Sequence, residues 1–218
     1  LFLLFLIFLN FSELKNKLKF LLVGFLIFYF ISLPLLFHLF SGKGFARFKQ
    51  TTFLKSFSQI FEIQTLKRIL KLYFQHFSFT FLFKKGDSGF PGQFITRHSI
   101  IGTGQLYLIQ LLFLIFGIVF LIWKKKIKEV LILGFWFLIY PLGTVFTNAP
   151  GPQATRSIIG VIPFQILSGL GLYFLLEIVK KISKKLYVIF VAIFLLAIGF
   201  LFFNFWKLFL QYPLYSSD

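Results

Sequence analysis

The sequence predicts an all-α protein, a polytopic bundle of transmembrane helices with one amphipathic helix outside the bilayer. Of the 218 residues, 58% are hydrophobic and only 13% are charged, and the mean hydropathy is +0.90. A soluble domain is about 45–50% apolar even when glycine is counted. The apolar residues also gather in runs of about the 20 residues that a helix needs to cross a bilayer. Clusters of lysine separate these runs, which is the pattern of a multi-pass membrane protein.

Five runs are long enough for full spans, and they cover residues 20–40, 105–123, 130–147, 157–178 and 186–206. A further apolar segment, 1–9 (LFLLFLIFL), is too short to cross a bilayer. We interpret it as the end of a clipped span. The chain contains no methionine, so we expect a fragment. We treat 1–218 as one membrane domain, the C-terminal transmembrane half of a larger protein.

The short loops predict the orientation of these spans. Lysines concentrate in 10–19, 124–129 and 180–185, which alternate along the chain and therefore share one face. Positively charged short loops normally face the cytoplasm. This places the chain in the cytoplasmic (inner) membrane, with the remaining connections outside: 41–104, 148–156 and 207–218.

The large outer segment 41–104 contains one stretch with a helical pattern. Within 53–77, apolar residues recur at helical spacing and basic residues fall between them. This pattern predicts an amphipathic helix that either lies in the outer membrane interface or packs on the bundle. Residues 84–104 are rich in glycine and include a proline, and they predict a loop.

Several function classes have no support. Without cysteine, thiol nucleophiles, iron–sulfur clusters and cysteine-bound zinc are excluded, and the three histidines have no spacing suited to zinc. No nucleotide-binding loop, serine elbow or zinc-protease motif is present. The net charge of +17 comes from lysines between apolar spans, which favours anionic lipid headgroups over nucleic acid. We assign no cofactor and leave a dependence on a divalent metal open.

Polar residues beside a membrane are costly and therefore point to function. Asp87 lies in the turn sequence Gly86-Asp87-Ser88-Gly89, where it either closes an Asx-turn or orients a substrate or metal. Asn148 and Gln153, in the loop before a later span, are further candidates for orienting the loop or a substrate.

Three cationic groups are candidates for binding phosphate. Arg156 opens a span at its outer end, where a cation opposes the helix dipole, so an anionic lipid headgroup would favour it there. The free amides of the same helix start also favour phosphate. Simple snorkelling of Arg156 to the interface is the alternative. Arg97 and His98 are adjacent in the outer loop and either bind phosphate or supply interfacial charge and turn hydrogen bonds.

Short motifs then give a family resemblance. Residues 77–117 carry an aromatic run, Gly86-Asp87, Arg97-His98-Ser99 and Gly102-x-Gly104-x-Leu106-Tyr107 before an apolar span. Residues 148–172 and 208–215 add Asn-Ala-Pro, Arg-Ser, Ile-Pro and Tyr-Pro elements. Over most of 20–215, the chain resembles bacterial membrane glycosyltransferases of the C superfamily, close to the dolichyl-phosphate-mannose–protein mannosyltransferases.

The resemblance implies a specific activity. Such enzymes transfer a sugar from a polyprenyl-phosphate donor to a lipid, glycan or protein acceptor on the extracytoplasmic face. It assigns Arg156, with Arg97 and His98, to the donor's lipid phosphate. It places the catalytic aspartate in an early outer loop with no counterpart in this chain, so no residue here is assigned a catalytic role and we expect the fragment to be inactive alone. Two alternatives stay open: a transporter or flippase for a lipid-linked substrate, and a non-catalytic membrane subunit.

Overall fold

The structure, a computed structural model, describes residues 2–11, 15–40, 46, 49–54, 56–90 and 100–216. These residues are almost all helical, and the part of the chain described contains no β-strand beyond an isolated bridge between Thr52 and Thr147. The chain divides into two compact units. Unit 1 comprises Leu1–Leu66 and Phe146–Asn148, and unit 2 comprises Lys67–Val145 and Ala149–Asp218. The all-helical prediction is confirmed.

Four helical segments are long and apolar enough to cross a membrane: Leu18–His38, Ile127–Val145, Ile158–Ile182 and Lys184–Pro213. These lengths and compositions are consistent with a multi-pass membrane protein. The apolar helix Ile109–Trp123 is shorter than these four segments. The remaining predicted full span, 105–123, is therefore helical over a shorter stretch in the structure than the sequence pattern predicts.

Unit 1 is dominated by one long helix. Helix α1 spans Phe2–Leu9, the 3₁₀ turn η1 spans Lys15–Lys17, and α3 spans Leu18–Phe40. Large apolar side chains of α3 such as Phe20, Phe30 and Phe37 are more than half exposed. Within unit 1, α3 is apolar all round and largely exposed, which suits an apolar surrounding such as a bilayer.

Helix α5 (Ile63–Gln75), preceded by the 3₁₀ turn η2 (Phe57–Phe61), occupies the stretch that the sequence predicts as amphipathic. Its C-terminal half is anchored in unit 2. Leu72 is buried, and the Tyr73 hydroxyl donates a hydrogen bond to the Leu138 carbonyl over 3.0 Å. The anchor continues just beyond the helix, where the Tyr140 hydroxyl donates to the carbonyl of His76. One side of the amphipathic helix is therefore packed on the bundle.

His76 is the most enclosed polar residue at this anchor. Its side chain is 0% exposed and lies edge-on to the rings of Phe81 and Tyr140. Its Nδ1 is 2.7 Å from the Leu72 carbonyl, and since a carbonyl only accepts, Nδ1 carries the proton. Nε2 has no partner among the described residues. Burial lowers the pKa of His76 to about 4 despite the opposing effect of the Leu72 bond, so the ring is neutral.

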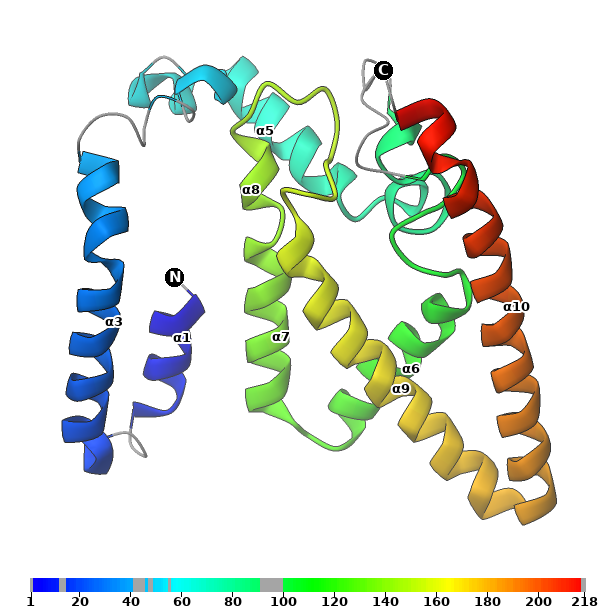
Figure 1. The fold of residues 1–218 in the computed structure, drawn as a ribbon. Coiled ribbons are helices and arrows are strands. Elements are labelled where there is room, and N and C mark those ends of the chain that lie inside the picture. Colours follow the sequence, from blue (N-terminus) through cyan, green and yellow to red (C-terminus); the bar gives the residue numbers. More distant parts are fainter. Residues whose placement is uncertain are drawn as a thin grey trace. The chain divides into compact units, whose positions relative to one another are not determined.

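The remaining helices build the bundle of unit 2. They are α6 (Ile109–Trp123), α7 (Ile127–Ile139), the short α8 (Leu142–Val145), α9 (Val161–Ile182) and α10 (Lys184–Ser216). Helices α6 and α9 form the main contact and run in the same direction, from a Gln110–Gln165 hydrogen bond to a Phe120–Phe174 ring contact. Helix α10 packs on α9, and α7 packs on both α6 and α9 (Figure 1).

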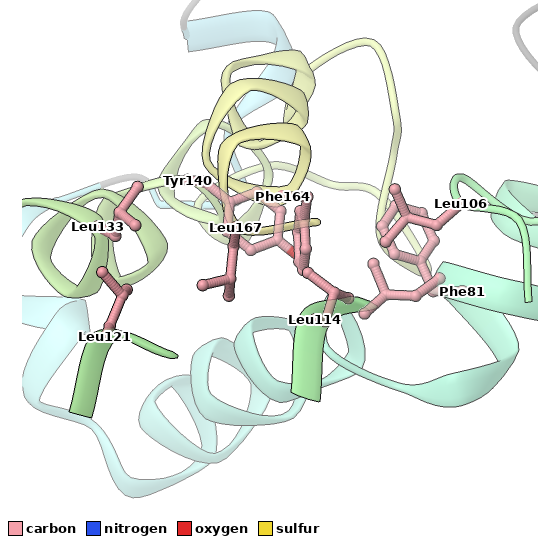
Figure 2. Close-up of a cluster of buried hydrophobic side chains, with 9 residues drawn as sticks. Phe81, Leu106, Leu114, Leu121, Leu133, Tyr140, Phe164 and Leu167 are labelled. Carbon is pink, nitrogen blue, oxygen red and sulfur yellow. The ribbon is translucent and has the colours of Figure 1, made fainter. Parts of the chain in front are cut away.

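Two glycines bring α6 and α9 together. A Cβ at Gly171 would collide with the Phe113 carbonyl, and one at Gly117 would collide with the Leu167 carbonyl. Around this crossing lies the core shown in Figure 2, which consists of Phe81, Leu82, Leu106, Leu114, Leu121, Leu133, Tyr140, Phe164 and Leu167. Gly169, two residues before Gly171 on the same helix, is exposed and has no atom within 4 Å of an added Cβ.

Both lysine-rich turns of unit 2 lie at the same end of the bundle, as predicted. One joins α6 to α7 and contains Lys124 and Lys125, and the other joins α9 to α10 around Ser183 (Figure 1). The turn after α6 is tight, with Lys125 at a φ of 51°, and it is followed by an exposed Lys126–Glu129 ion pair at 3.6 Å. The opposite end holds the start of α6, the end of α7 and the start of α9.

Helix α10 is longer than the span that the sequence predicts. It continues past residue 206 to Ser216, with Pro213 inside it. Four aromatic residues stack from the end of the predicted span into this extension, in the order Phe202, Trp206, Phe209 and Tyr212. Such pairs at i,i+3 and i,i+4 stabilise a helix. The predicted outer tail is therefore helical over its first part.

Candidate functional site

The candidate site lies at the end of unit 2 opposite to its two lysine-rich turns and is organised by Asp87. This residue sits in the 3₁₀ turn η4 (Gly86–Gly89), and its side chain is only 3% exposed. Its Oδ1 accepts a hydrogen bond from the Ala154 N–H at 3.0 Å and a weaker one from Gln105 Nε2 at 3.5 Å. One buried carboxylate thus joins three segments that are far apart in the sequence. The expected local Asx-turn does not account for these two tertiary bonds.

Two glycines in the sequence allow this convergence. Gly86 has a φ of +55°, and an added Cβ would lie 2.9 Å from the Thr103 carbonyl oxygen. A Cβ at Gly104 would lie within 2.6 Å of the backbone of Phe83. The segments approach closely enough for Leu106 N–H to donate to the Leu82 carbonyl at 2.8 Å. This backbone pairing draws 103–106 out of helix, so α6 begins at Ile109.

Arg156 follows two residues after Ala154, the backbone partner of Asp87. Its side chain is half-buried, and its backbone packs directly against Gly143. The preceding Gln153 carbonyl accepts bonds from the Ser157 hydroxyl at 2.6 Å and from the Ser157 N–H at 3.1 Å. The loop closed by these bonds is followed directly by η6 (Ile158–Gly160) and α9. Arg156 and Gln153 therefore lie in the loop that Asp87 holds.

Of the remaining predicted site residues, the structure describes only Asn148. Asn148 belongs to unit 1, where its N–H donates to the Thr51 carbonyl at 2.8 Å and its Nδ2 to the Thr52 carbonyl at 3.3 Å. Its amide thereby fixes the backbone beside the Thr52–Thr147 bridge. Arg97 and His98 lie outside the described residues.

Next to the Asp87 turn, unit 2 contains a cavity of about 630 Å³ between residues 102–108 and the helices α6, α9 and α10. Gln105 lines the cavity and also bonds to Asp87. The polar part of the lining includes Thr103, Gln105, Gln110, Gln165 and Ser168. The apolar part includes Phe113, Leu172, Phe194, Ile198, Leu201 and Phe205. Because the lining is polar on one part and apolar on the rest, the cavity suits an amphipathic molecule with a hydrocarbon chain.

A hydrogen-bonded glutamine pair crosses the cavity wall. Gln110 Nε2 donates to Gln165 Oε1 at 3.0 Å, while Gln110 Oε1 accepts from the Tyr107 N–H at 2.9 Å and caps the start of α6. Polar side chains within membrane spans commonly form such bonds between helices. The neighbouring Ser168 hydroxyl is buried and has no partner among the described residues.

The described part of this site offers groups that can bind a ligand. No acidic, basic or histidine side chain is among the described residues that line the cavity. Among the described residues, no group of three or more histidine, aspartate or glutamate side chains could hold a metal ion. What the arrangement offers is a fixed loop with a cation, a buried carboxylate that positions it, and an adjacent apolar cavity with amide groups.

Sequence reasoning did not identify the partners of Asp87. Gln105 was assigned to a span, and Ala154 carries no side-chain signal because it contributes only a backbone N–H. The spacing Gly102-x-Gly104 before an apolar run was the available clue, since paired glycines often mark a close approach of backbones.

Comparison of the chain with protein-family models, with curated proteins and with solved structures finds no match. The fold and the hydropathy establish a helical protein with several helices able to span a membrane. The glycosyltransferase resemblance rests on the sequence motifs alone.

Proposed function

We propose that this chain is the membrane-embedded C-terminal part of a glycosyltransferase that takes a sugar from a polyprenyl-phosphate donor and passes it to a lipid, glycan or protein acceptor. The observation that carries the proposal is the Asp87 clamp. It holds the Arg156 loop against the turn containing Gln105, and Gln105 also lines the apolar cavity. Asp87 thus connects the loop that carries Arg156 with a residue of the hydrocarbon-lined cavity, and a cation together with an apolar cavity matches the two parts of a lipid phosphate.

In this proposal Arg156 binds the phosphate of the donor. A guanidinium presents several N–H groups in a planar fork that pairs with phosphate oxygens, and such charge-assisted bonds strengthen where water is scarce. As the sugar leaves, negative charge grows on the phosphate, so a fixed cation there also favours the transition state. Arg97 and His98 are proposed as additional phosphate ligands.

Asp87 is a positioning residue in this scheme and not the general base. Its carboxylate is buried and already accepts bonds from Ala154 and Gln105, so it is poorly placed to take a proton from an acceptor hydroxyl. The resemblance assigns that base to an outer loop that precedes these residues in the family.

We further propose that the lysine-rich turns of unit 2 face the cytoplasm and that the Asp87 clamp lies on the extracytoplasmic side. Support comes from the positive-inside tendency and from the common location of both turns at one end of the bundle. In this scheme, the lipid-linked sugar is used on the side of the membrane opposite to the two lysine-rich turns.

The test compares two probes that differ only in charge, decaprenyl phosphate and the neutral alcohol decaprenol, for binding to the purified chain in nanodiscs. Arg156→Ala should weaken binding of the phosphate about tenfold or more, as expected for the loss of a hydrogen bond to a charged group. Binding of decaprenol should not change. The matched control is Arg68→Ala, which removes an exposed arginine from the polar face of α5 and should leave both affinities as they are.

If Arg156→Ala leaves phosphate affinity intact, Arg156 is not a donor ligand. If the wild-type chain binds the alcohol as tightly as the phosphate, the lipid-phosphate function is refuted.

A further inference from the structure

Helix α5 has an exposed apolar side in addition to the side that is packed in unit 2. Leu70 is 45% exposed and Phe74 is 64% exposed, and the preceding turn continues the stripe with Leu66 at 47% and Ile63 at 70%. These residues are three or four apart and share one face of the helix. The buried Leu72 lies on a different face. Folding of the described chain therefore leaves a continuous apolar stripe along α5 without protein cover.

A second side of α5 is basic. Lys67 and Lys71 are both exposed and lie four residues apart, so their ammonium groups are neighbours on the helix surface. The helix sequence IQTLKRILKLYFQ contains no acidic residue that could offset them. Like charges at this spacing disfavour a helix. An anion bound between the two lysines would relieve that repulsion.

The anchoring contacts give the depth of α5 relative to a candidate span. The Tyr73 hydroxyl bonds to the Leu138 carbonyl, and the Tyr140 hydroxyl bonds to His76 just after the helix. Tyr140 lies five residues before the end of the candidate span at Val145, about 8 Å by helical rise. Interfacial helices bury their apolar faces about 5–10 Å into the boundary between headgroups and acyl chains. With Val145 taken as the end of a membrane span, α5 would lie at the depth where the apolar stripe meets acyl chains and the lysines meet headgroups.

We propose that α5 binds anionic phospholipid headgroups through Lys67 and Lys71, with the stripe of Leu70 and Phe74 inserted between acyl chains. A bilayer is the partner favoured by the rest of the chain, because four helical segments of the described residues are long and apolar enough to span one. Two lysines without a neighbouring acid select phosphate-rich, negatively charged lipids over zwitterionic ones. This inference does not depend on the proposed glycosyltransferase function.

The absence of cysteine from the chain makes a site-specific test direct. A fluorophore attached at Leu70→Cys of the full chain is followed in nanodiscs containing brominated phosphatidylglycerol or brominated phosphatidylcholine, since bromine quenches only on contact. We expect quenching by both lipids and a local preference for phosphatidylglycerol of about thirtyfold, from about 1 kcal/mol for each of the two lysines near an anionic surface. Phe74→Cys serves as a second label position if the first variant folds poorly.

Three comparisons decide the outcome. A label at Gln64→Cys, on the polar side of α5, should be quenched much less than one at Leu70→Cys. Lys67→Gln with Lys71→Gln should reduce the phosphatidylglycerol preference towards one, whereas Lys180→Gln with Lys181→Gln, the same charge change at the other end of α9, should preserve it. Absence of quenching at Leu70→Cys would show that the stripe does not contact lipid and would favour a protein partner. A preference that is absent, or that persists without Lys67 and Lys71, would refute the headgroup site.

Discussion

The crossing of α6 and α9 can be tested with two glycines on one helix. Gly171→Ala would place a methyl group 2.7 Å from the Gly117 backbone nitrogen and still closer to the Phe113 carbonyl oxygen. Backbone atoms cannot rotate away as a side chain can, so the helices must separate. Gly169→Ala adds the same methyl group two residues earlier, where no atom lies within 4 Å. The pair holds the chemical change constant and varies only the packing.

The two variants should differ in sign. Overpacking a helix crossing costs about 1–3 kcal/mol, which exceeds the gain of at most about 1 kcal/mol that alanine has over glycine in a helix. Gly171→Ala should therefore destabilise the protein, while Gly169→Ala should be neutral or slightly stabilising. For a chain of this length, 1 kcal/mol corresponds to about 2–4 °C in Tm. We expect Gly171→Ala to lower the Tm by several degrees and Gly169→Ala to leave it unchanged or raise it.

A suitable assay is thermal unfolding in detergent micelles, followed by circular dichroism and by tryptophan fluorescence. Trp123 reports on the crossing directly, because its ring lies 5.4 Å from that of Phe174 on α9. A Gly171→Ala variant as stable as the wild type would refute the close contact at the crossing. Gly169→Ala destabilised as much as Gly171→Ala would refute it as well.

Two further predictions concern the buried polar groups. The pKa of His76 is about 4 in the folded state against 6.5 for an ordinary histidine. Between pH 6.5 and pH 4, the unfolded chain therefore binds a proton at this residue and the folded chain does not. Stability should therefore fall as the pH drops from 6.5 to 4, by about 3 kcal/mol in all, and His76→Gln should flatten this part of the Tm–pH curve; an unchanged slope would assign the pH dependence elsewhere. Asp87→Ala removes the acceptor for the Ala154 N–H and should cost about 1–3 kcal/mol, with faster hydrogen exchange at that amide. Ser88→Ala, in the same turn, should leave the exchange rate unaltered, and equal protection in both variants would contradict the clamp.

Hydropathy alone located most of the helices because a membrane span needs only a sufficient length of apolar residues. The predicted spans 130–147, 157–178 and 186–206 each overlap an observed candidate span. The ends were less predictable. The span predicted from residue 105 begins as helix at Ile109, since 103–106 pair with the backbone near Leu82. Apolar composition does not distinguish such an extended segment from helix.

The amphipathic stretch shows a similar limit. Periodicity indicated two apolar environments for it, the bilayer interface or the bundle, and could not separate them. The structure packs Leu72 and leaves Leu70 and Phe74 exposed, so packing on the bundle accounts for one side only. One helix can bury one face and expose another, which a single hydrophobic period does not resolve.

For the candidate site, the chemically unusual residues can be recognised from the sequence. Asp87, Gln153 and Arg156 stand out because few polar groups occur near the spans. How these three residues are connected becomes visible in the folded chain. Asp87 accepts a hydrogen bond from the Ala154 N–H, 67 positions away in the sequence, and thereby holds the Arg156 loop. It likewise decided that Gln105 links the clamp to the cavity. Composition and hydrophobic period reflect the surroundings of a single segment, water or lipid. Hydrogen bonds and close glycine contacts depend on which segments, distant in the sequence, lie side by side in the fold.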